Sequence, residues 1–312
     1  MIAFLFPGQG AQYPGMGAGI AAREPAAARL FARASAVLGF DLLALCADGS
    51  AEELRATENT QPAILVTSLA CAAALEARGI RPSAAAGLSL GEYSALVAAG
   101  ALGFEDAVAL VRRRGLFMQE AVAGRETAMA ALMGLDPDAV ERLCRAHRHL
   151  GVVEPANYNG GGQIVIGGDA AAVKAAMAAA REAGARRAVL LSVSSPFHTS
   201  LMAAAAAQLA PLLGETSLRD AAVPVVANAS GEPAQVAADI RELLIRQVAS
   251  PVQWERSVRA LAALGADTFI EVGPGTTLSG LVRKIIPAAV MRHVENTRTL
   301  DETLDALGAR VR

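Results

Sequence analysis

Residues 84–91 read Ala84-Ala85-Ala86-Gly87-Leu88-Ser89-Leu90-Gly91, so one serine stands between two glycines after a short apolar run. A helix-compatible run, Glu92 to Ala99, follows directly. This order is typical of the nucleophile elbow, in which a serine is held on a sharp turn between a strand and a helix. Glycine suits both flanking positions, because the turn brings backbone segments so close that side chains there would collide. The pattern predicts an exposed Ser89 hydroxyl near N–H groups at a helix start, which can stabilise an oxyanion.

Strand-like and helical stretches alternate on both sides of this elbow. Buried strands are predicted at 2–6, 83–88, 223–227 and 268–272. Helices are predicted at 26–38, 51–56, 61–77, 92–99, 105–122, 236–248, 252–264 and 277–284. Strands that alternate with helices favour a mainly parallel sheet covered on both faces. We therefore expect an α/β fold whose hydrolase-like large subdomain consists of residues 1–124 and 193–312.

The middle of the chain has a different order of elements. Strands are predicted at 129–135, 151–157, 163–166 and 187–193, with helices at 136–147 and 169–183. This β-α-β-β-α-β order is the ferredoxin-like pattern. We predict that residues 125–192 form an inserted ferredoxin-like small subdomain.

Composition argues against several classes of protein. The 312 residues are 53% hydrophobic and 19% charged with a net charge of −2, which predicts a large core and no basic stripe for nucleic acid. No apolar run reaches the ~20 residues that cross a bilayer, so no membrane partner is expected. Cys46, Cys71 and Cys144 are far apart and odd in number. They predict small core residues, no metal site and a reducing, cytoplasmic setting.

A serine hydroxyl needs a base, and His198 is the best candidate among four histidines. It follows a predicted strand and Pro196 and stands at a helix start, a position where parallel-sheet enzymes place function. His147, His149 and His293 lie in polar segments instead. Because no acidic residue stands beside His198, a backbone carbonyl or an amide is expected to orient it.

Six ordered motifs then resemble the malonyl-CoA:acyl carrier protein transacylase family, which includes stand-alone fatty-acid enzymes and polyketide synthase acyltransferases. The resemblance covers nearly the whole chain. The motifs are Phe6-Pro7-Gly8-Gln9-Gly10-Ala11-Gln12, Gly87-Leu88-Ser89-Leu90-Gly91-Glu92-Tyr93, Arg114-Gly115-Leu116-Phe117-Met118-Gln119, Pro196-Phe197-His198, Gln247 before Pro251-Val252-Gln253-Trp254, and Glu271-Val272-Gly273-Pro274-Gly275.

The resemblance implies a role for each matching residue. Ser89 matches the nucleophile that takes the acyl group as an ester, and His198 matches its general base. Gln9 and Leu90 match the positions whose backbone N–H groups form the oxyanion hole. Gln247 matches the residue whose main-chain carbonyl orients the histidine, which would account for the missing acid.

Arg114 matches the arginine that pairs with the malonyl carboxylate. A guanidinium offers a planar fork that fits a carboxylate with two parallel hydrogen bonds. The residues alone leave an alternative, because Arg112, Arg113 and Arg114 could form a basic helix face. Helical periodicity barely distinguishes Arg113 from Arg114 as the residue that faces the interior. The choice of Arg114 therefore rests on the resemblance.

Other positions bear on substrate recognition. Phe197 precedes the histidine, and in polyketide relatives phenylalanine there accompanies malonyl and serine accompanies methylmalonyl. Asn157 and Asn159 match a segment that lines the cleft, although both also suit turns. Leu88 departs from the family, many of whose members carry histidine before the serine, so no polar contact is expected from that side.

The resemblance implies a ping-pong transfer of malonyl from malonyl-CoA to the phosphopantetheine thiol of an acyl carrier protein, by a monomer without a bound cofactor or metal. Carrier proteins are usually acidic, so a basic docking patch is expected. Its candidate residues are Lys174, Arg181, Arg186 and Arg187. Two alternatives remain, a serine thioesterase that edits misloaded carriers and a non-catalytic carrier-docking protein.

Overall fold

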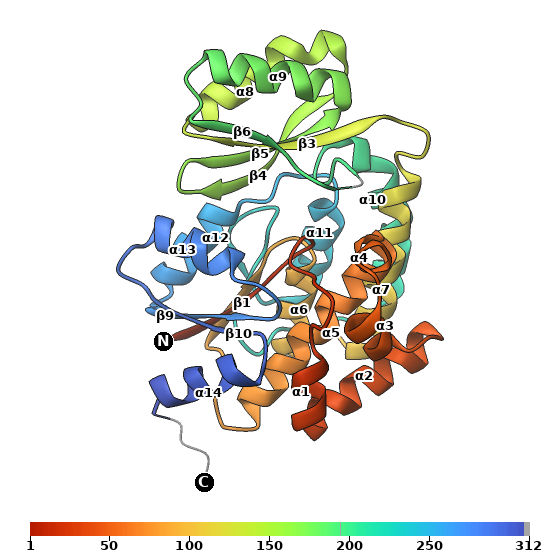
Figure 1. The fold of residues 1–312 in the computed structure, drawn as a ribbon, viewed down its shortest axis with the longest axis vertical. Coiled ribbons are helices and arrows are strands. Elements are labelled where there is room, and N and C mark those ends of the chain that lie inside the picture. The colour runs from red at the N-terminus through yellow and green to blue at the C-terminus, as the bar shows by residue number, and fades with distance from the viewer. Residues whose placement is uncertain (194, 309–312) are drawn as a thin grey trace.

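The computed structural model describes residues 1–193 and 195–308, which form two separate sheets with helices around them (Figure 1). The larger sheet has six strands in the order β10-β9-β1-β2-β7-β8, and the smaller has four in the order β4-β5-β3-β6. The predicted α/β fold class is confirmed, with a mainly parallel larger sheet and an antiparallel smaller one.

The larger sheet is parallel except where its two shortest strands meet in antiparallel pairing. Its strands are β1 (Ile2–Phe6), β2 (Ala84–Gly87), β7 (Val225–Val226), β8 (Pro233–Ala234), β9 (Thr268–Val272) and β10 (Val290–Val294). Successive side chains of β1 point to opposite faces. Phe4 and Phe6 belong to one hydrophobic core, whereas Ala3 and Leu5 belong to another. Both faces of this sheet are therefore buried.

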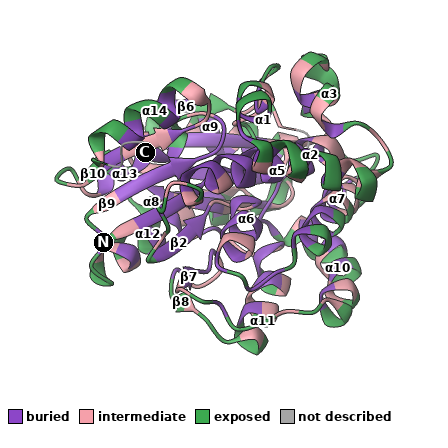
Figure 2. Ribbon diagram, turned by 90° about the horizontal axis from the view of Figure 1, so that it is seen from below, coloured by how far each residue is buried: buried purple, intermediate pink, exposed green. Residues whose placement is uncertain are grey.

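Helices cover the two faces unequally. The Phe4 and Phe6 face meets the larger group, which is α1 (Ala18–Arg23), α2 (Pro25–Leu38), α3 (Leu42–Asp48), α4 (Ala51–Arg55), α5 (Thr57–Glu76), α6 (Gly91–Ala98), α7 (Phe104–Glu120), α10 (Ala203–Glu215), α11 (Ala237–Gln247) and α14 (Thr297–Ala306). The opposite face meets α12 (Trp254–Ala263) and α13 (Thr277–Ile285). Figure 2 shows the buried strands enclosed by helices that expose their outer sides.

The smaller sheet is formed by β3 (Thr127–Met133), β4 (Val153–Gly160), β5 (Gln163–Asp169) and β6 (Arg187–Leu190). Helices α8 (Pro137–His147) and α9 (Ala170–Glu182) pack on it and share its own hydrophobic core. A short 3-10 helix, Arg148–Leu150, precedes β4, and another, Ser200–Met202, precedes α10. The predicted β-α-β-β-α-β order is present, with every strand pair antiparallel.

Several elements differ from the prediction. Helices α1, α3, α10 and α14 and strands β8 and β10 were not predicted, and α5 begins at Thr57 rather than Gln61. The early start of α5 places Pro62 inside the helix, where its ring nitrogen cannot donate to the carbonyl of Glu58. A side chain supplies the missing donor, because the Arg112 guanidinium donates to the Glu58 carbonyl at 3.3 Å. Tertiary contacts thus override the local helix-breaking signal.

Two predictions from composition can be compared with the described residues. Cys46, Cys71 and Cys144 are free and buried, as predicted, and burial raises the pKa of each thiol to about 12. No single described helix has the length and apolar character to cross a membrane. Helices α2 and α3 together have enough length and apolar character, but the pair is bent by 110° where the two helices meet. This result rests on length and composition only.

Candidate active site

Ser89 lies at the sharp turn between β2 and α6 with a left-handed backbone, φ 56°. The two glycines beside it are required by close backbone approach. A Cβ atom on Gly87 would lie 1.9 Å from the carbonyl carbon of Gly91, and one on Gly91 would lie 2.0 Å from the Phe6 oxygen. Neither position can hold a side chain without moving the backbone. The strand, turn and helix are arranged as the elbow pattern predicts.

Two amide side chains hold this strained turn from both sides. The Ser89 N–H donates to Asn228 Oδ1 at 2.6 Å, and Asn228 Nδ2 donates to the Gly87 carbonyl at 2.7 Å. Gln247 Nε2 donates to the Ser89 carbonyl at 2.8 Å. A left-handed non-glycine residue costs on the order of 1–3 kcal/mol and persists where its surroundings fix it. Asn228 and Gln247 supply that constraint.

The serine has a base within reach. Ser89 Oγ lies 2.6 Å from His198 Nε2, and His198 Nδ1 lies 2.9 Å from the Gln247 carbonyl oxygen. A carbonyl can only accept, so Nδ1 carries the proton and Nε2 is left to accept the serine hydroxyl. Burial and then the positive charge of Arg114 lower the pKa of His198 to about 4. The imidazole is therefore neutral near pH 7 and able to take a proton.

Arg114 brings a buried positive charge to the same place. Its side chain is 2% exposed, Nη2 donates to Ser89 Oγ at 3.0 Å and to Gln247 Oε1 at 2.9 Å, and Nη1 donates to Gln61 Oε1 at 2.9 Å. The guanidinium also lies over the Tyr93 ring, 5.5 Å from its centroid. Within residues 1–193 and 195–308, Arg114 forms no ion pair with a carboxylate. A desolvated cation with no carboxylate in direct contact is costly, which suits an anionic ligand.

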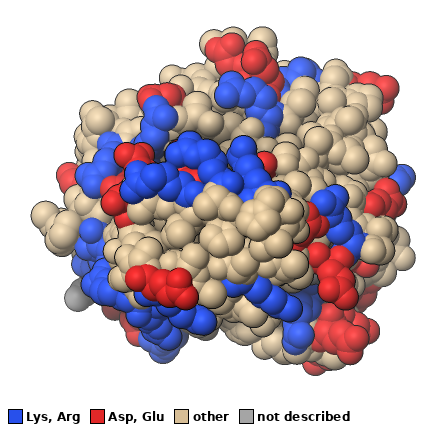
Figure 3. Space-filling model, turned by 90° about the horizontal axis from the view of Figure 1, so that it is seen from above, with Lys and Arg blue, Asp and Glu red and all other residues tan. Residues whose placement is uncertain are grey.

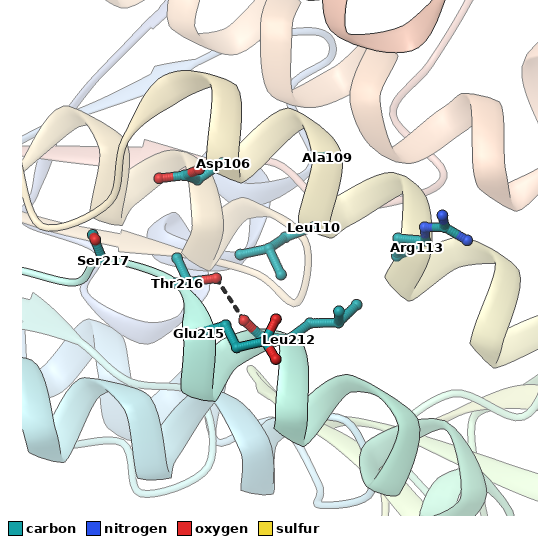
Figure 4. A pocket seen from close by; sticks show the side chains of 8 residues that line it. All are labelled: Asp106, Ala109, Leu110, Arg113, Leu212, Glu215, Thr216 and Ser217. Atoms are coloured by element: carbon teal, nitrogen blue, oxygen red, sulfur yellow. Dashed lines mark hydrogen bonds between the residues drawn. The ribbon is translucent and has the colours of Figure 1, made fainter.

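Arg113 faces the other way. Its side chain is exposed and lines an outer pocket between α7 and the end of α10, together with Asp106 and Glu215. Figure 4 shows Asp106 and Arg113 on α7 and Glu215 on the facing end of α10. The uncertainty between the two arginines is thus resolved by burial, since Arg114 alone turns toward the serine.

The serine opens onto a small cavity between the two sheets. Its walls are formed by Gln9, Leu88, Ser89, Arg114, Met129, Asn157, Val165, Leu191, Val193, Phe197 and His198. Met129, Asn157 and Val165 belong to β3, β4 and β5, so the smaller sheet closes one side. Any acyl group on Ser89 would be enclosed between the sheets.

The remaining predicted residues are placed as follows. Asn157 lines the cavity, whereas Asn159, two residues further along β4, does not, and its amide nitrogen donates to Gln163 Oε1 at 3.0 Å. Leu90 is fully buried at the start of α6. The backbone N–H groups of Gln9 and Leu90 make no hydrogen bond to any other described residue. Such free donors beside the serine suit an oxyanion.

Sequence reasoning missed a buried carboxyl next to the elbow. Glu92 is 2% exposed, and its Oε2 accepts from Gln247 Nε2 at 2.9 Å and from the Asn228 N–H at 3.0 Å. Burial raises the pKa of Glu92 to about 7, against the lowering effect of these hydrogen bonds and of Arg114. The sequence does contain a sign of this buried carboxyl, because Glu92 is the one charged residue in the apolar stretch from Ser83 to Phe104.

The other three histidines belong to other parts of the fold. His147 ends α8 and His149 lies in the 3-10 helix after it, where each ring donates from Nδ1 to a nearby carbonyl, and His293 lies on β10. In the part of the chain that the structure describes, no group of three or more His, Cys, Asp or Glu side chains is arranged to hold a metal ion.

Comparisons with known proteins agree with this geometry. The acyl transferase domain model matches residues 3–296. The malonyl CoA-acyl carrier protein transacylase of Bacillus subtilis is 48% identical over 307 residues, which cover 98% of this chain and 97% of that protein. The crystal structure of MCAT from Streptococcus pneumoniae superposes with a TM-score of 0.94 at 46% identity, covering 98% of this chain and 100% of that one.

A third relative was solved with a partner. It is a malonyl-transacylase in complex with its type II PKS acyl-carrier protein, and it superposes with a TM-score of 0.95 at 42% identity, covering 98% of this chain and 99% of that one. Matches of this identity over nearly full length leave no large part of the fold unaccounted for. This chain belongs to the malonyl CoA-acyl carrier protein transacylase family, whose members carry the acyl transferase domain.

Proposed function

We propose that this enzyme transfers a malonyl group from malonyl-CoA to the phosphopantetheine thiol of an acyl carrier protein, through a malonyl ester on Ser89. One observation carries the proposal. The Ser89 hydroxyl oxygen lies 2.6 Å from a neutral imidazole and 3.0 Å from a buried guanidinium that has no carboxylate partner among the described residues. A nucleophile, a base and an anion-binding group therefore meet at one atom.

In the first half-reaction, His198 Nε2 takes the Ser89 proton as Oγ attacks the thioester carbonyl carbon. The tetrahedral oxyanion is held by the backbone N–H groups of Gln9 and Leu90. The C–S bond then breaks, and His198 returns the proton to the departing CoA sulfur. The Gln247 carbonyl keeps the imidazole oriented throughout and stabilises the imidazolium.

In the second half-reaction, His198 takes the proton from the carrier's thiol, whose sulfur attacks the malonyl-serine ester. Collapse of the second tetrahedral intermediate releases Ser89, which recovers its proton from His198. The thioester is already activated, so the sequence of steps requires neither a metal ion nor a redox cofactor.

Arg114 is proposed to bind the free carboxylate of the malonyl group. A malonyl carboxylate could take the place of Ser89 Oγ and Gln247 Oε1 as acceptors from Nη2. Phe197, which lines the cavity, would fill the space that an α-methyl group needs, an effect worth about 1–3 kcal/mol. Of the two asparagines, Asn157 is the proposed substrate contact because it lies on the cavity wall, whereas the role of Asn159 stays a prediction.

We propose that the carrier protein docks on a basic groove at one end of the smaller sheet, where β3 ends and β5 and β6 begin. Arg186 and Arg187, at the start of β6, line it together with Lys284 from α13. Figure 3 shows bands of Lys and Arg side chains on this end of the molecule. Lys174 and Arg181 lie on α9, where Arg181 donates to the Ala188 carbonyl at 2.9 Å. A basic groove suits an acidic carrier.

We also propose the division into a large subdomain, residues 1–124 and 193–312, and a small subdomain, residues 125–192. Its support is the separate hydrophobic core of the antiparallel sheet. A monomeric state and a reducing, cytoplasmic setting stay predictions.

Intact-protein mass spectrometry after incubation with malonyl-CoA, methylmalonyl-CoA or acetyl-CoA tests the assignment. We expect a malonyl adduct that is lost in Ser89→Ala and reduced at least tenfold in rate by Arg114→Ala, because one charge-assisted pair is lost. Arg113→Ala is the matched control, since it removes the neighbouring exposed guanidinium. Ready acylation by acetyl-CoA but not by malonyl-CoA would contradict the carboxylate role of Arg114.

The same assay separates transfer from hydrolysis. With a carrier protein present, a transferase moves the adduct to the phosphopantetheine thiol, whereas a thioesterase releases free malonate. Malonate as the main product would favour the editing enzyme. Full carrier loading by Ser89→Ala would favour a non-catalytic docking protein.

A further inference from the structure

Glu92 and Arg114 are opposite buried charges separated by a single amide side chain. Arg114 Nη2 donates to Gln247 Oε1 at 2.9 Å, and Gln247 Nε2 donates to Glu92 Oε2 at 2.9 Å. Each charged side chain is 2% exposed. Among the described residues, neither forms a direct ion pair. The Gln247 amide thus links the carboxylate to the guanidinium without neutralising the side of Arg114 that faces the cavity.

We propose that ionised Glu92 is the counter-charge of Arg114 in the empty site, and that a bound malonyl carboxylate replaces it, so that malonyl binding is coupled to uptake of a proton by Glu92. The inference rests on the proposed function, because it requires that Arg114 receives the malonyl carboxylate. It adds a residue and a linkage that the transfer reaction itself does not require.

The coupling follows from the charge balance of a buried site. In the empty enzyme, the field of Arg114 stabilises the ionised form of Glu92 against the cost of burial. A malonyl carboxylate paired with the guanidinium cancels that field and adds a second negative charge nearby. Both effects raise the pKa of Glu92, which is about 7 before binding. The carboxylate then takes a proton from solvent and becomes neutral.

Few other groups can carry this titration. Strands β1, β2 and β7, which pack against α6, contain no titratable side chain. The next residue on α6, Tyr93, has its pKa raised to about 12, and that of His198 is lowered to about 4, so both stay neutral near pH 7. The titratable groups of α5 and α7 are Glu58, Cys71, Glu76, Glu105, Asp106, Arg112, Arg113, Arg114 and Glu120. Among these, Arg114 is the group that Gln247 links to Glu92, and its positive charge lowers the pKa of Glu92. On α11, which carries Gln247, Asp239, Glu242 and Arg246 are exposed and Arg241 donates to the carbonyls of Gly214 and Thr216.

Protonation of Glu92 leaves the elbow in place. Its Oε2 accepts from Gln247 Nε2 and from the Asn228 N–H, and a neutral carboxyl oxygen can accept both hydrogen bonds as well. Gln247 therefore keeps its orientation, its carbonyl still faces His198, and Ser89 is still held. Glu92 acts as a positioning residue through hydrogen bonding and as a counter-charge through ionisation.

Isothermal titration calorimetry of Ser89→Ala with malonyl-CoA measures the coupling directly, since the variant binds without transferring. Titrations at pH 7 in two buffers of different ionisation enthalpy give the number of protons taken up. We expect about half a proton per malonyl bound at pH 7, because a group with a pKa of about 7 is half protonated beforehand. Acetyl-CoA shares every ionisable group of the CoA moiety, so its value is the baseline to subtract.

Two double variants identify the group. Ser89→Ala with Glu92→Gln keeps the hydrogen-bond acceptor and removes the charge, so the uptake should disappear while malonyl-CoA still binds. Ser89→Ala with Glu271→Gln is the matched control, because Glu271 is another buried carboxyl that accepts two backbone N–H groups, those of Leu278 and Ser279. Uptake should persist there.

The outcomes separate the inference from the proposed function. Suppose that malonyl-CoA binding depends on Arg114 but takes up no more protons than acetyl-CoA binding, or that proton uptake persists in Glu92→Gln. Either result overturns the role of Glu92 and leaves the proposed transferase function intact. Malonyl-CoA that binds no better than acetyl-CoA overturns both.

A second measurement uses the enzyme with Ser89 in place. Binding that takes up a proton weakens as pH rises, by up to about tenfold per pH unit above pH 7. KM for malonyl-CoA should therefore rise from pH 7 to 8.5 in the natural chain and stay flat in Glu92→Gln. If Glu92 had a purely structural role, Glu92→Gln would change kcat or stability, and KM for malonyl-CoA would still rise with pH.

Discussion

At the scale of single residues, two non-glycine positions among the described residues have left-handed backbones, Ser89 with φ 56° and His198 with φ 62°. They are the two groups whose side chains meet at 2.6 Å. Strain of this kind collects where a reactive side chain must be aimed and where the surroundings fix the backbone. Asn228 and Gln247 supply the constraint at Ser89, and the Gln247 carbonyl supplies it at the imidazole.

The lowered pKa of His198 predicts how acylation depends on pH. With a pKa of about 4, His198 stays neutral at pH 5, so the second-order rate of Ser89 acylation should fall less than twofold between pH 6 and 5. A histidine of ordinary pKa would lose about eightfold over that range. Rapid-quench mass spectrometry of the adduct measures the rate. An eightfold loss in a chain that circular dichroism shows to be folded would contradict this prediction.

The same shift has a cost in stability. The unfolded chain takes a proton on this histidine near pH 6.5, whereas the native state resists until about pH 4. The native state therefore loses stability as pH falls through that window. In His198→Ala, denaturant unfolding at pH 7 and 5 should show a smaller loss of stability than in the natural chain.

At the scale of elements, α5 and α7 approach closely where the site needs them. A Cβ atom on Gly115 would lie 2.9 Å from both the Thr57 carbonyl oxygen and the Glu58 Cα. Gly115 directly follows Arg114, and α5 carries Gln61, which accepts from the guanidinium. The absence of a side chain at Gly115 thus sets the distance between the helix that presents the arginine and the helix that orients it.

Substitution of two helical glycines separates packing from helix propensity. Gly115→Ala should destabilise the protein by about 1–3 kcal/mol, because its Cβ meets backbone that must move. It should also weaken malonyl acylation by displacing Arg114. Gly280→Ala on α13 meets nothing within 4 Å and should stabilise by about 0.5–1 kcal/mol. Urea unfolding measures both, and a neutral Gly115→Ala would show that the two helices can separate without loss.

At the scale of the whole molecule, the site exists because two sheets meet. The smaller sheet is joined to the larger part by backbone hydrogen bonds, from the Tyr158 N–H to the Val252 carbonyl and from the Val252 N–H to the Ala156 carbonyl, each at 2.9 Å. Glu154 on β4 also accepts from the N–H and hydroxyl of Ser200. These contacts fix the cavity wall opposite Ser89.

The proposed docking groove spans the same junction. Because the carrier protein takes part only in the second half-reaction, a substitution in the groove should change that step alone. Arg187→Glu should lower kcat/KM for the carrier protein by about tenfold or more and leave Ser89 acylation by malonyl-CoA unchanged, since like charges repel an acidic partner. Arg29→Glu on α2, at the opposite end of the molecule in Figure 1, is the matched control. Equal effects of both variants would point to general electrostatic attraction.

Sequence reasoning reached the elements whose signals are local. The elbow needs only a strand, two glycines and a helix start, and the ferredoxin-like order needs only hydrophobic runs separated by turns. Helix α10 escaped prediction because its alanine-rich stretch includes Pro211, and short helices such as α1 and α3 give little periodic signal. The six motifs, taken in order, then indicated the family and the residues matched to its roles.

By itself, the sequence determined the family, the fold class and the pairing of Ser89 with His198. Only the tertiary structure decided which arginine is buried, which asparagine reaches the cavity and that Asn228, Gln247 and Glu92 form one hydrogen-bonded group next to Ser89. The reason is distance along the chain, since Gln247 lies 158 residues after Ser89 and 155 after Glu92. No local pattern encodes such contacts, because each depends on the packing of elements far apart in sequence.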